Sequence, residues 1–240
     1  QAVGAVCWIH DAAAASFIRC TVTNCEAYAS LGMVFGSVAS VAGGSHLSFT
    51  GTVVAYCTAV ALSTNVLGGG VFVESSSSVS LVNSSMLNVS ARSPLVAAGG
   101  AFFVTSRSNL SLVSSSITRC SVESTGFTAM AGAIFGLGYS TITLEAGSAM
   151  VNCSATTSGI DAAASGGAMY MQDSYASLTN CSVSGCTVTS VAGRAYGGAL
   201  FLDNNCIVSL VASTVHGCTV SATGDEAAGG AFYLSKQDSL

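Results

Sequence analysis

One short phrase, a glycine pair followed by alanine and a bulky apolar residue, recurs along this chain. It reads "SGGAMYM" at 165–171, "YGGALFL" at 196–202 and "AGGAFYL" at 228–234. The second glycine of each copy serves as a marker, and the markers are Gly70, Gly100, Gly132, Gly167, Gly198 and Gly230. Their spacings are 30, 32, 35, 31 and 32 residues, and weaker copies at 36–49 and 4–9 extend the series. A period of about 32 residues over the whole chain predicts a repeat architecture.

Two further ladders support the same period. A serine-leucine step about eleven residues after each marker ends at Phe49, Leu81, Leu112, Leu144, Leu178, Leu210 and Leu240. The alternation of hydroxyl and apolar residues in this step is typical of a strand with one buried face. The second ladder consists of Cys25, Cys57, Asn88, Cys120, Cys153, Cys186 and Cys218. Each repeat therefore holds three predicted strands, at the glycine phrase, the leucine step and the cysteine step.

Three short strands per repeat, with no helical stretch, fit few architectures. A propeller blade needs four strands and about 40 or more residues, and an antiparallel sandwich would not place like residues on like. We predict an all-β, right-handed parallel β-helix of about seven coils, in which equivalent residues stack at about 4.8 Å per coil. The glycine pairs then mark corners and close approaches rather than a phosphate-binding loop, because they recur and precede strands instead of one helix.

The two ends of the sequence lack an amphipathic helix or a polar cap. An open end of a β-helix exposes unpaired backbone groups, which natural proteins cover. We therefore expect residues 1–240 to form a single β-helix segment of a longer solenoid. Its expected partners are further coils or other copies of the same protein, joined end to end.

Composition excludes several classes of protein. Only 7% of residues are charged and half are hydrophobic, whereas a disordered chain shows the reverse balance. Six Lys and Arg against eleven Asp and Glu leave no basic cluster for a nucleic acid. The longest apolar runs, such as 53–62, are about half the length of a bilayer-spanning helix. We expect neither a nucleic-acid partner nor a transmembrane segment.

The glycine-alanine-aromatic phrase, preceded by stretches such as "LTNCSVSGCTV" at 178–188, resembles the repeats of chlamydial polymorphic outer-membrane proteins and their pectin-lyase-like relatives. The resemblance covers nearly the whole chain. It implies a right-handed parallel β-helix in a large surface or secreted protein, often an adhesin. It implies no catalysis by itself, because a fold does not fix a function.

The residues predict no catalytic or metal site and no cofactor. Glycoside hydrolases need paired carboxylates, and pectate-lyase-like sites resemble one another in using carboxylate-bound calcium with a basic residue. The only acidic crowding is Asp173 with Asp203 and Asn204, for which a turn role and a weak calcium or sugar contact both remain open. The histidines, His10, His46 and His216, fall at three different repeat positions.

Alternate residues of a strand point to opposite faces, so the bulky residues of the glycine phrase fall into two sets. The set that we expect to face the core is Phe72, Phe102, Ile134, Met169, Leu200 and Phe232. The intervening set would form an outward aromatic ladder of Phe103, Phe135, Tyr170, Phe201 and Tyr233. If these rings are exposed, they are the best candidate for a contact surface, since contiguous exposed apolar patches mark partners. If this set faces inward instead, its rings belong to the core.

The ten cysteines allow two interpretations. The cysteine ladder of Cys25, Cys57, Cys120, Cys153, Cys186 and Cys218 fits buried reduced thiols, because stacked side chains rarely meet the torsion of a disulfide. In an oxidising compartment, Cys20 with Cys25, Cys181 with Cys186, and Cys7 and Cys206 could pair instead.

Asn-x-Ser/Thr sequences give candidate N-glycosylation sites at Asn83, Asn109, Asn152 and Asn180. A fifth, at Asn88, falls in the cysteine ladder, and we expect it to point inward.

Two functions remain. The first is a non-catalytic structural or adhesive rod of the cell surface, an extracellular appendage or a matrix, in contact with cell-surface glycans or proteins. The second is a polysaccharide-binding or polysaccharide-cleaving domain. Clustered carboxylates on one face, or release of unsaturated or reducing ends from acidic polysaccharides, would favour the second.

Overall fold

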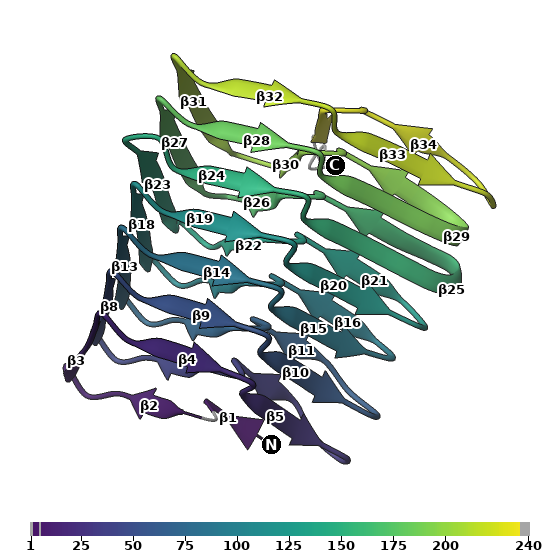
Figure 1. Cartoon of the computed structure of the whole chain (residues 1–240). Coiled ribbons are helices and arrows are strands. Elements are labelled where there is room, and N and C mark those ends of the chain that lie inside the picture. The colour runs from purple at the N-terminus through teal and green to yellow at the C-terminus, as the bar shows by residue number, and fades with distance from the viewer. Residues whose placement is uncertain (1, 5, 236–240) are drawn as a thin grey trace.

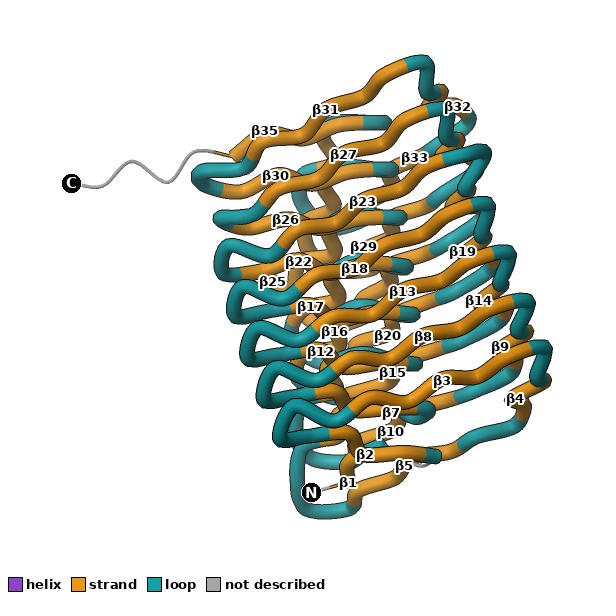
Figure 2. The backbone as a smooth tube through the Cα atoms, turned by 90° about the vertical axis from the view of Figure 1, so that its left-hand side faces the viewer, coloured by secondary structure: helices purple, strands orange, loops and turns teal. Residues whose placement is uncertain are grey.

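The chain is a parallel β-solenoid. The computed structural model describes residues 2–4 and 6–235, and those residues contain strands and turns but no helix. About seven coils stack in order from the N-terminus to the C-terminus (Figures 1 and 2). Every strand pair is parallel, and paired residues lie about 32 positions apart, as Val79 and Leu110 do. The predicted all-β solenoid and its period are confirmed.

Three sheets, which we call B, C and D, enclose the body of each coil. Sheet B contains β2 (Cys7–Ile9), β7 (Ala39–Val41), β12 (Val71–Val73), β17 (Phe102–Val104), β22 (Ile134–Leu137), β26 (Met169–Gln172), β30 (Leu200–Asp203) and β35 (Phe232–Ser235). Sheet C contains β3 (Ala14–Ile18), β8 (His46–Thr50), β13 (Ser78–Val82), β18 (Asn109–Val113), β23 (Thr141–Glu145), β27 (Tyr175–Thr179) and β31 (Ile207–Val211). Sheet D contains β4 (Thr21–Thr23), β9 (Val53–Ala55), β14 (Ser85–Leu87), β19 (Ser116–Thr118), β24 (Ala149–Val151), β28 (Ser182–Ser184) and β32 (Thr214–His216).

A fourth sheet, A, forms an arm that runs out from the body and returns (Figure 1). Its outgoing strands are β5 (Glu26–Ala29), β10 (Thr58–Ala61), β15 (Ser90–Ser93), β20 (Ser121–Ser124) and β33 (Thr219–Ala222). Its returning strands are β1 (Ala2–Val3), β6 (Val34–Phe35), β11 (Val66–Leu67), β16 (Val96–Ala98), β21 (Thr128–Met130) and β34 (Ala227–Ala228). β25 (Ser154–Ser165) and β29 (Thr187–Tyr196) run continuously through both parts.

A coil therefore holds more strands than the three that the sequence predicted. The predicted strands correspond to sheets B, C and the outgoing part of A. The strands of sheet D and the returning strands of the arm were missed. They are mostly two or three residues long and, unlike the equally short strands of sheet B, they carry no recurring sequence phrase.

The interior of the body and the interior of the arm differ in side-chain size. The body is filled by large residues that stack in columns, such as Leu81, Leu112 and Leu144 in sheet C and Met86 and Ile117 in sheet D, all almost fully buried. The interior of the arm is lined by alanine and valine, namely Ala27, Ala29, Val34, Ala59, Ala61, Val66, Ala91, Ala97, Val122, Ala129, Ala155, Ala164, Val188 and Ala195. These small residues allow its two layers to approach closely.

The glycine pair forms the junction where the arm returns to the body. Its first member, Gly99 for example, has φ +69°, a left-handed conformation that glycine adopts without strain. A Cβ on the second member, Gly100, would collide with the carbonyl oxygen of Gly132 and with the backbone of Ser121. The recurring phrase is therefore architectural, one glycine providing the turn and the other the close approach of backbone to backbone.

At three other corners of the coil, a residue with a left-handed backbone conformation precedes a small residue whose side chain points inward. At the corner between sheets C and D, for instance, Asn83 has φ +49° and the next residue, Ser84, is buried. The Ser84 hydroxyl donates to the carbonyl of Val82 and accepts the backbone N–H of Thr52 in the coil before. Such side-chain bonds satisfy backbone groups that the corner leaves unpaired.

The structure corrects the predicted register at two positions. Gly69, rather than Gly70, is equivalent to Gly100, since Val71 pairs with Phe102 and Phe72 with Phe103. In the cysteine ladder, Val89 rather than Asn88 occupies the inward position, because the Ser121 N–H donates to its carbonyl just as the Ser154 N–H donates to that of Cys120. A third glycine in "LGGG" and a one-residue change in turn length produced the two errors. Leu240, the last residue of the predicted leucine ladder, lies outside the described residues.

Candidate functional site

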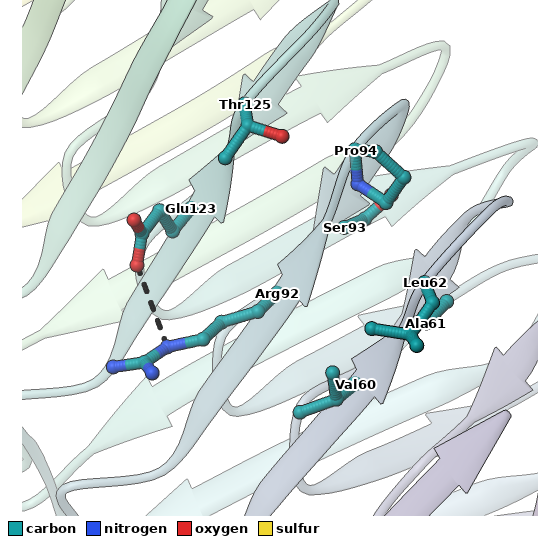
Figure 3. Close-up of a pocket in the computed structure, with 8 residues that line it drawn as sticks. All are labelled: Val60, Ala61, Leu62, Arg92, Ser93, Pro94, Glu123 and Thr125. Atoms are coloured by element: carbon teal, nitrogen blue, oxygen red, sulfur yellow. Dashed lines mark ion pairs between the residues drawn. The ribbon is translucent and has the colours of Figure 1, made fainter. Parts of the chain in front are cut away.

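A groove crosses the outer face of the arm over β5, β10, β15 and β20. It consists of two adjoining depressions of about 270 and 380 Å³ that share Val60 and Arg92. The first is also lined by Ala61, Leu62, Ser93, Pro94, Glu123 and Thr125 (Figure 3). The second is also lined by Asn24, Cys25, Glu26, Tyr56 and Thr58. Because alternate residues of a strand point outward, Val60, Arg92 and Glu123 form one column across three coils.

The polar centre of the groove is an ion pair. The Nε of Arg92 lies 3.4 Å from Oε2 of Glu123, and the two side chains are 62% and 50% exposed (Figure 3). An ion pair this exposed contributes at most about 1 kcal/mol to folding. Its main effect is to present a guanidinium and a carboxylate, with several hydrogen-bonding atoms, to anything that enters the groove.

Tyr56 forms part of the groove wall from an unfavourable backbone position. Its φ is +57° and the residue is 57% exposed. The equivalent positions in the other coils also have positive φ, and they are occupied by Asn24, Asn88, Arg119, Asn152, Gly185 and Gly217. Asn and Gly tolerate this conformation, whereas a bulky ring gains nothing from it. The corner geometry therefore does not require a tyrosine, and its ring adds an exposed aromatic surface to the groove wall.

The groove combines an exposed ring, a guanidinium and carboxylates on an open surface. A sugar presents an apolar C–H face and several hydroxyls, so it can stack on the Tyr56 ring while its hydroxyls bond to Arg92, Glu26 or Glu123. These residues were not predicted from the sequence. A usable signal was nevertheless present, since Tyr56 stands where the repeat otherwise favours Asn or Gly.

The aromatic ladder forms as predicted, on the face of sheet B that points away from the body. Phe103, Phe135, Tyr170 and Phe201 stack with ring centroids 4.7–4.9 Å apart, and Tyr233 follows at 5.1 Å. Phe72, which we predicted to face the core, belongs to this ladder instead.

The predicted exposure of this ladder is wrong for most of its rings. Phe72, Phe103, Phe135, Tyr170 and Phe201 are only 4–8% exposed, and Tyr233 is partly buried. The rings fill the angle between sheet B and the returning strands of the arm, where they pack against residues such as Ala98 and Met130. The ladder is thus a third small core rather than an open contact surface.

The cysteine ladder is placed as predicted. Cys57, Cys120, Cys153 and Cys186 are fully buried in one column, and Cys25 and Cys218 are half-buried at its two ends. All ten cysteines are free thiols in the structure. Burial raises the pKa of Cys57 and of Cys120 to about 12. These thiols therefore stay protonated at neutral pH, which matches the interpretation of the ladder as small core residues.

The predicted acidic group is a turn. Asp173 and Asn204 have φ +47° and +57°, and the Asn205 side-chain amide donates to the Asp173 carboxylate at 3.2 Å. Asp203 accepts a hydrogen bond from the Tyr170 hydroxyl at 3.4 Å. Burial and the Asp203 carboxylate raise the pKa of Tyr170, so the hydroxyl remains a donor.

The three histidines lie on different elements, as expected. His10 contacts Asp11, His46 contacts Ser78, and His216 ends β32. Within residues 2–4 and 6–235, no group of three or more His, Cys, Asp or Glu side chains is arranged to hold a metal ion. The same residues include no helix long and apolar enough to span a bilayer.

The four favoured glycosylation candidates are all exposed. Asn83 and Asn180 occupy the corner between sheets C and D, Asn152 the next corner, and Asn109 begins β18. Asn88 is only partly buried and lies at the same corner as Asn152, so the prediction that it points inward is wrong.

No family model, curated protein or solved structure that was compared with this chain matches it.

Proposed function

We propose that this chain is part of an extracellular, non-catalytic adhesive rod that binds cell-surface glycans through the groove on the arm. The observation that carries the proposal is Tyr56, an exposed ring held in a left-handed conformation beside the Arg92–Glu123 pair. The resemblance to surface β-helix repeats and the exposed glycosylation candidates on the corners of sheet D support the extracellular location.

Other copies of the protein are the second class of partner that we propose. Leu210, Phe232 and Leu234 of the last described coil are 39%, 38% and 76% exposed. Their equivalents one coil earlier, Leu178, Leu200 and Leu202, are 0%, 0% and 8% exposed. An additional layer stacked on this coil would bury the same columns. Sedimentation velocity over a range of concentrations tests association between copies, with Leu234→Asp expected to prevent it.

Glycan-array screening, followed by calorimetric titration of the best ligand, tests the groove. Tyr56→Asn removes the ring and installs a residue that suits the backbone, so we expect roughly tenfold weaker binding or more with no loss of thermal stability. Tyr139→Asn is the matched control, because Tyr139 is also exposed (60%) with φ +62° but lies outside the groove. Arg92→Ala should weaken binding as well.

Two results would contradict the proposal. Equal affinity of the wild-type protein and Tyr56→Asn for the glycan would show that the groove is not the binding site. Release of unsaturated or reducing ends from polysaccharides incubated with the protein would contradict its non-catalytic part and favour the polysaccharide-cleaving alternative.

A further inference from the structure

The free end of the arm carries a row of exposed apolar side chains. Each coil turns there from its outgoing part to its returning part, and the turns lie one above another along one edge of the molecule (Figure 1). Five of the turns contribute a residue that is 53–88% exposed, namely Leu31, Leu62, Phe127, Ile160 and Val191. The turn between Leu62 and Phe127 contributes Leu95, which is partly buried. We call this row of six residues the tip ridge.

Buried hydroxyl groups hold the turns of the tip ridge in place. Ser124 is fully buried, and its hydroxyl donates to the carbonyl of Leu95 in the coil before at 2.7 Å. The same hydroxyl accepts the backbone N–H of Phe127 at 3.2 Å. The hydroxyl of Ser190 makes the equivalent two bonds, one to the coil before and one within its own turn. A surface fixed in this way has little conformational freedom to lose when it binds a partner.

The tip ridge is large for an apolar surface in contact with water. Its side chains together expose on the order of 600 Å², the upper end of what a typical monomeric protein leaves exposed. A specific interface takes about 800 Å² from each partner, with an apolar centre and a polar rim. The turns supply such a rim through the exposed residues Ser30, Ser63, Thr125 and Ser158.

Charge favours a second copy of this chain over a lipid surface as the partner. Asp161 is the only charged residue in the six turns, which span 30–33, 62–65, 94–95, 125–127, 158–161 and 191–193. Segments that lie on a membrane surface combine apolar residues with Lys or Arg, and neither occurs in these turns. A nearly uncharged apolar ridge instead matches another surface of the same kind.

A linear ridge can pack against itself in two orientations. In a parallel pair, Asp161 of one copy would lie beside Asp161 of the other, and like charges repel. In an antiparallel pair related by a two-fold axis, the first coil meets the sixth and the second meets the fifth. Leu31 then lies opposite Val191, and Leu62 opposite Ile160. The two Asp161 carboxylates are three coils apart in this arrangement, or about 14 Å.

We propose that two copies of the chain associate side by side through the tip ridge, in antiparallel orientation. This contact differs from end-to-end stacking, because a two-fold interface closes at two copies whereas stacking along the axis continues. The tip ridge and the groove meet at Leu62 and Thr125. The variants that test the ridge therefore lie outside the groove.

Sedimentation velocity of Leu234→Asp tests the ridge alone, because this substitution is expected to prevent end-to-end association. We expect a monomer–dimer equilibrium between about 1 and 100 µM, with no larger species. Adding Ile160→Asp should weaken the dimer roughly tenfold or more, since it places a carboxylate in the apolar centre of the interface. Leu31→Asp provides a second variant at the far end of the ridge.

Ile18→Asp is the matched control for Ile160→Asp. Ile18 is 61% exposed, but it lies on the outer face of sheet C instead of the arm. The dimer should therefore be unchanged in the double variant Leu234→Asp/Ile18→Asp. Circular dichroism confirms that each variant is folded.

Photo-crosslinking tests the orientation. A benzophenone-bearing amino acid at position 63, in the turn of the second coil, should attach to residues 158–161 of the second copy, which mass spectrometry identifies. Within one copy these two turns are three coils apart, about 14 Å, so attachment there reports on the contact between copies.

The proposal is overturned if Leu234→Asp stays monomeric over this concentration range. It is also overturned if folded Ile160→Asp and Leu31→Asp variants dimerise as well as their parent. Attachment of position 63 to residues 62–65 of the second copy would contradict the antiparallel orientation. Binding to neutral phosphatidylcholine vesicles that is lost in Ile160→Asp would assign the ridge to a lipid surface instead.

Discussion

The body and the arm are built from the same coils, yet they hold their layers together differently. In the body, columns such as Leu112 and Leu144 fill a wide interior with large side chains. In the arm, columns such as Ala91 and Ala59 leave almost no interior to fill. At the junction between them, the second glycine of each pair brings backbone against backbone with no side chain at all. Side-chain volume thus decreases from body to arm to junction, and the shape of the coil follows from that gradient.

This difference predicts how each region responds to a change in volume. The body should be sensitive to lost volume, because a cavity there cannot collapse around stacked neighbours. The arm and the junction should be sensitive to added volume. The following variants test that contrast, from the largest expected effect to the smallest.

Gly100→Val should have the largest effect. Its side chain would meet the carbonyl of Gly132 and the backbone of Ser121, which cannot move without separating two coils. We expect a loss of about 4 kcal/mol or more, or failure to fold. Chemical denaturation followed by circular dichroism measures the loss, and a loss below about 1 kcal/mol would contradict the role of the junction.

Leu144→Ala should destabilise the body by about 3 kcal/mol, through lost burial and the cavity that remains. Leu144 is fully buried between Leu112 and Leu178. The urea midpoint should fall while the slope of the transition stays constant. A loss below about 1 kcal/mol would indicate a loosely packed body.

Ala129→Leu tests the arm in the opposite direction. Ala129 is fully buried between Ala97 and Ala164, so three added carbons must push the two layers apart. We expect a loss of about 2 kcal/mol. Ala129→Gly should cost only about 1 kcal/mol, mainly through backbone entropy. If the leucine stabilises the protein, the arm contains unfilled space and the comparison fails.

The smallest effect should come from the returning part of the arm in the last two coils, where Arg194, Asp225 and Glu226 lie near the junction with the body. The Tyr196 hydroxyl donates to Glu226 at 2.9 Å, and burial together with this carboxylate raises the pKa of Tyr196 to about 12. A raised pKa favours the folded state while tyrosine is protonated, so this contribution is complete below about pH 10, the ordinary pKa, and is lost as the pH rises toward 12. Ultraviolet titration should show Tyr196 ionising at lower pH in Glu226→Gln. An unchanged titration would contradict the assignment.

The sequence predicted the fold well wherever residues repeat in type. The leucine step and the cysteine ladder recur within one or two residues of the same spacing, and stacking like on like is what a solenoid requires. It failed wherever a single extra residue shifts the register, as in "LGGG" before Phe72 and at Asn88 beside Val89. A one-residue shift exchanges the inward and outward positions of a strand. A small error in spacing therefore assigned a residue to the wrong face of the sheet.

The candidate sites were harder to predict, because they depend on what lies across from each strand. Parity correctly placed the aromatic ladder on the outer face of sheet B, but nothing in the local sequence indicated that the arm would cover it. The groove is marked by one exception, a tyrosine at a corner position that mostly holds asparagine or glycine. Exceptions of this kind become visible only after the register is known.

The most direct test of the account measures distances along one column. Ser16, Ser48, Ser177 and Ser209 all point outward from the middle of sheet C, in coils that the structure stacks in order. Pairs of spin labels can be attached through a ketone-bearing amino acid, which leaves the native cysteines untouched. The account predicts separations of about 19 Å for 48 and 177, 24 Å for 48 and 209, and 29 Å for 16 and 209, at about 4.8 Å per coil. Separations that do not rise linearly with the number of coils would contradict it.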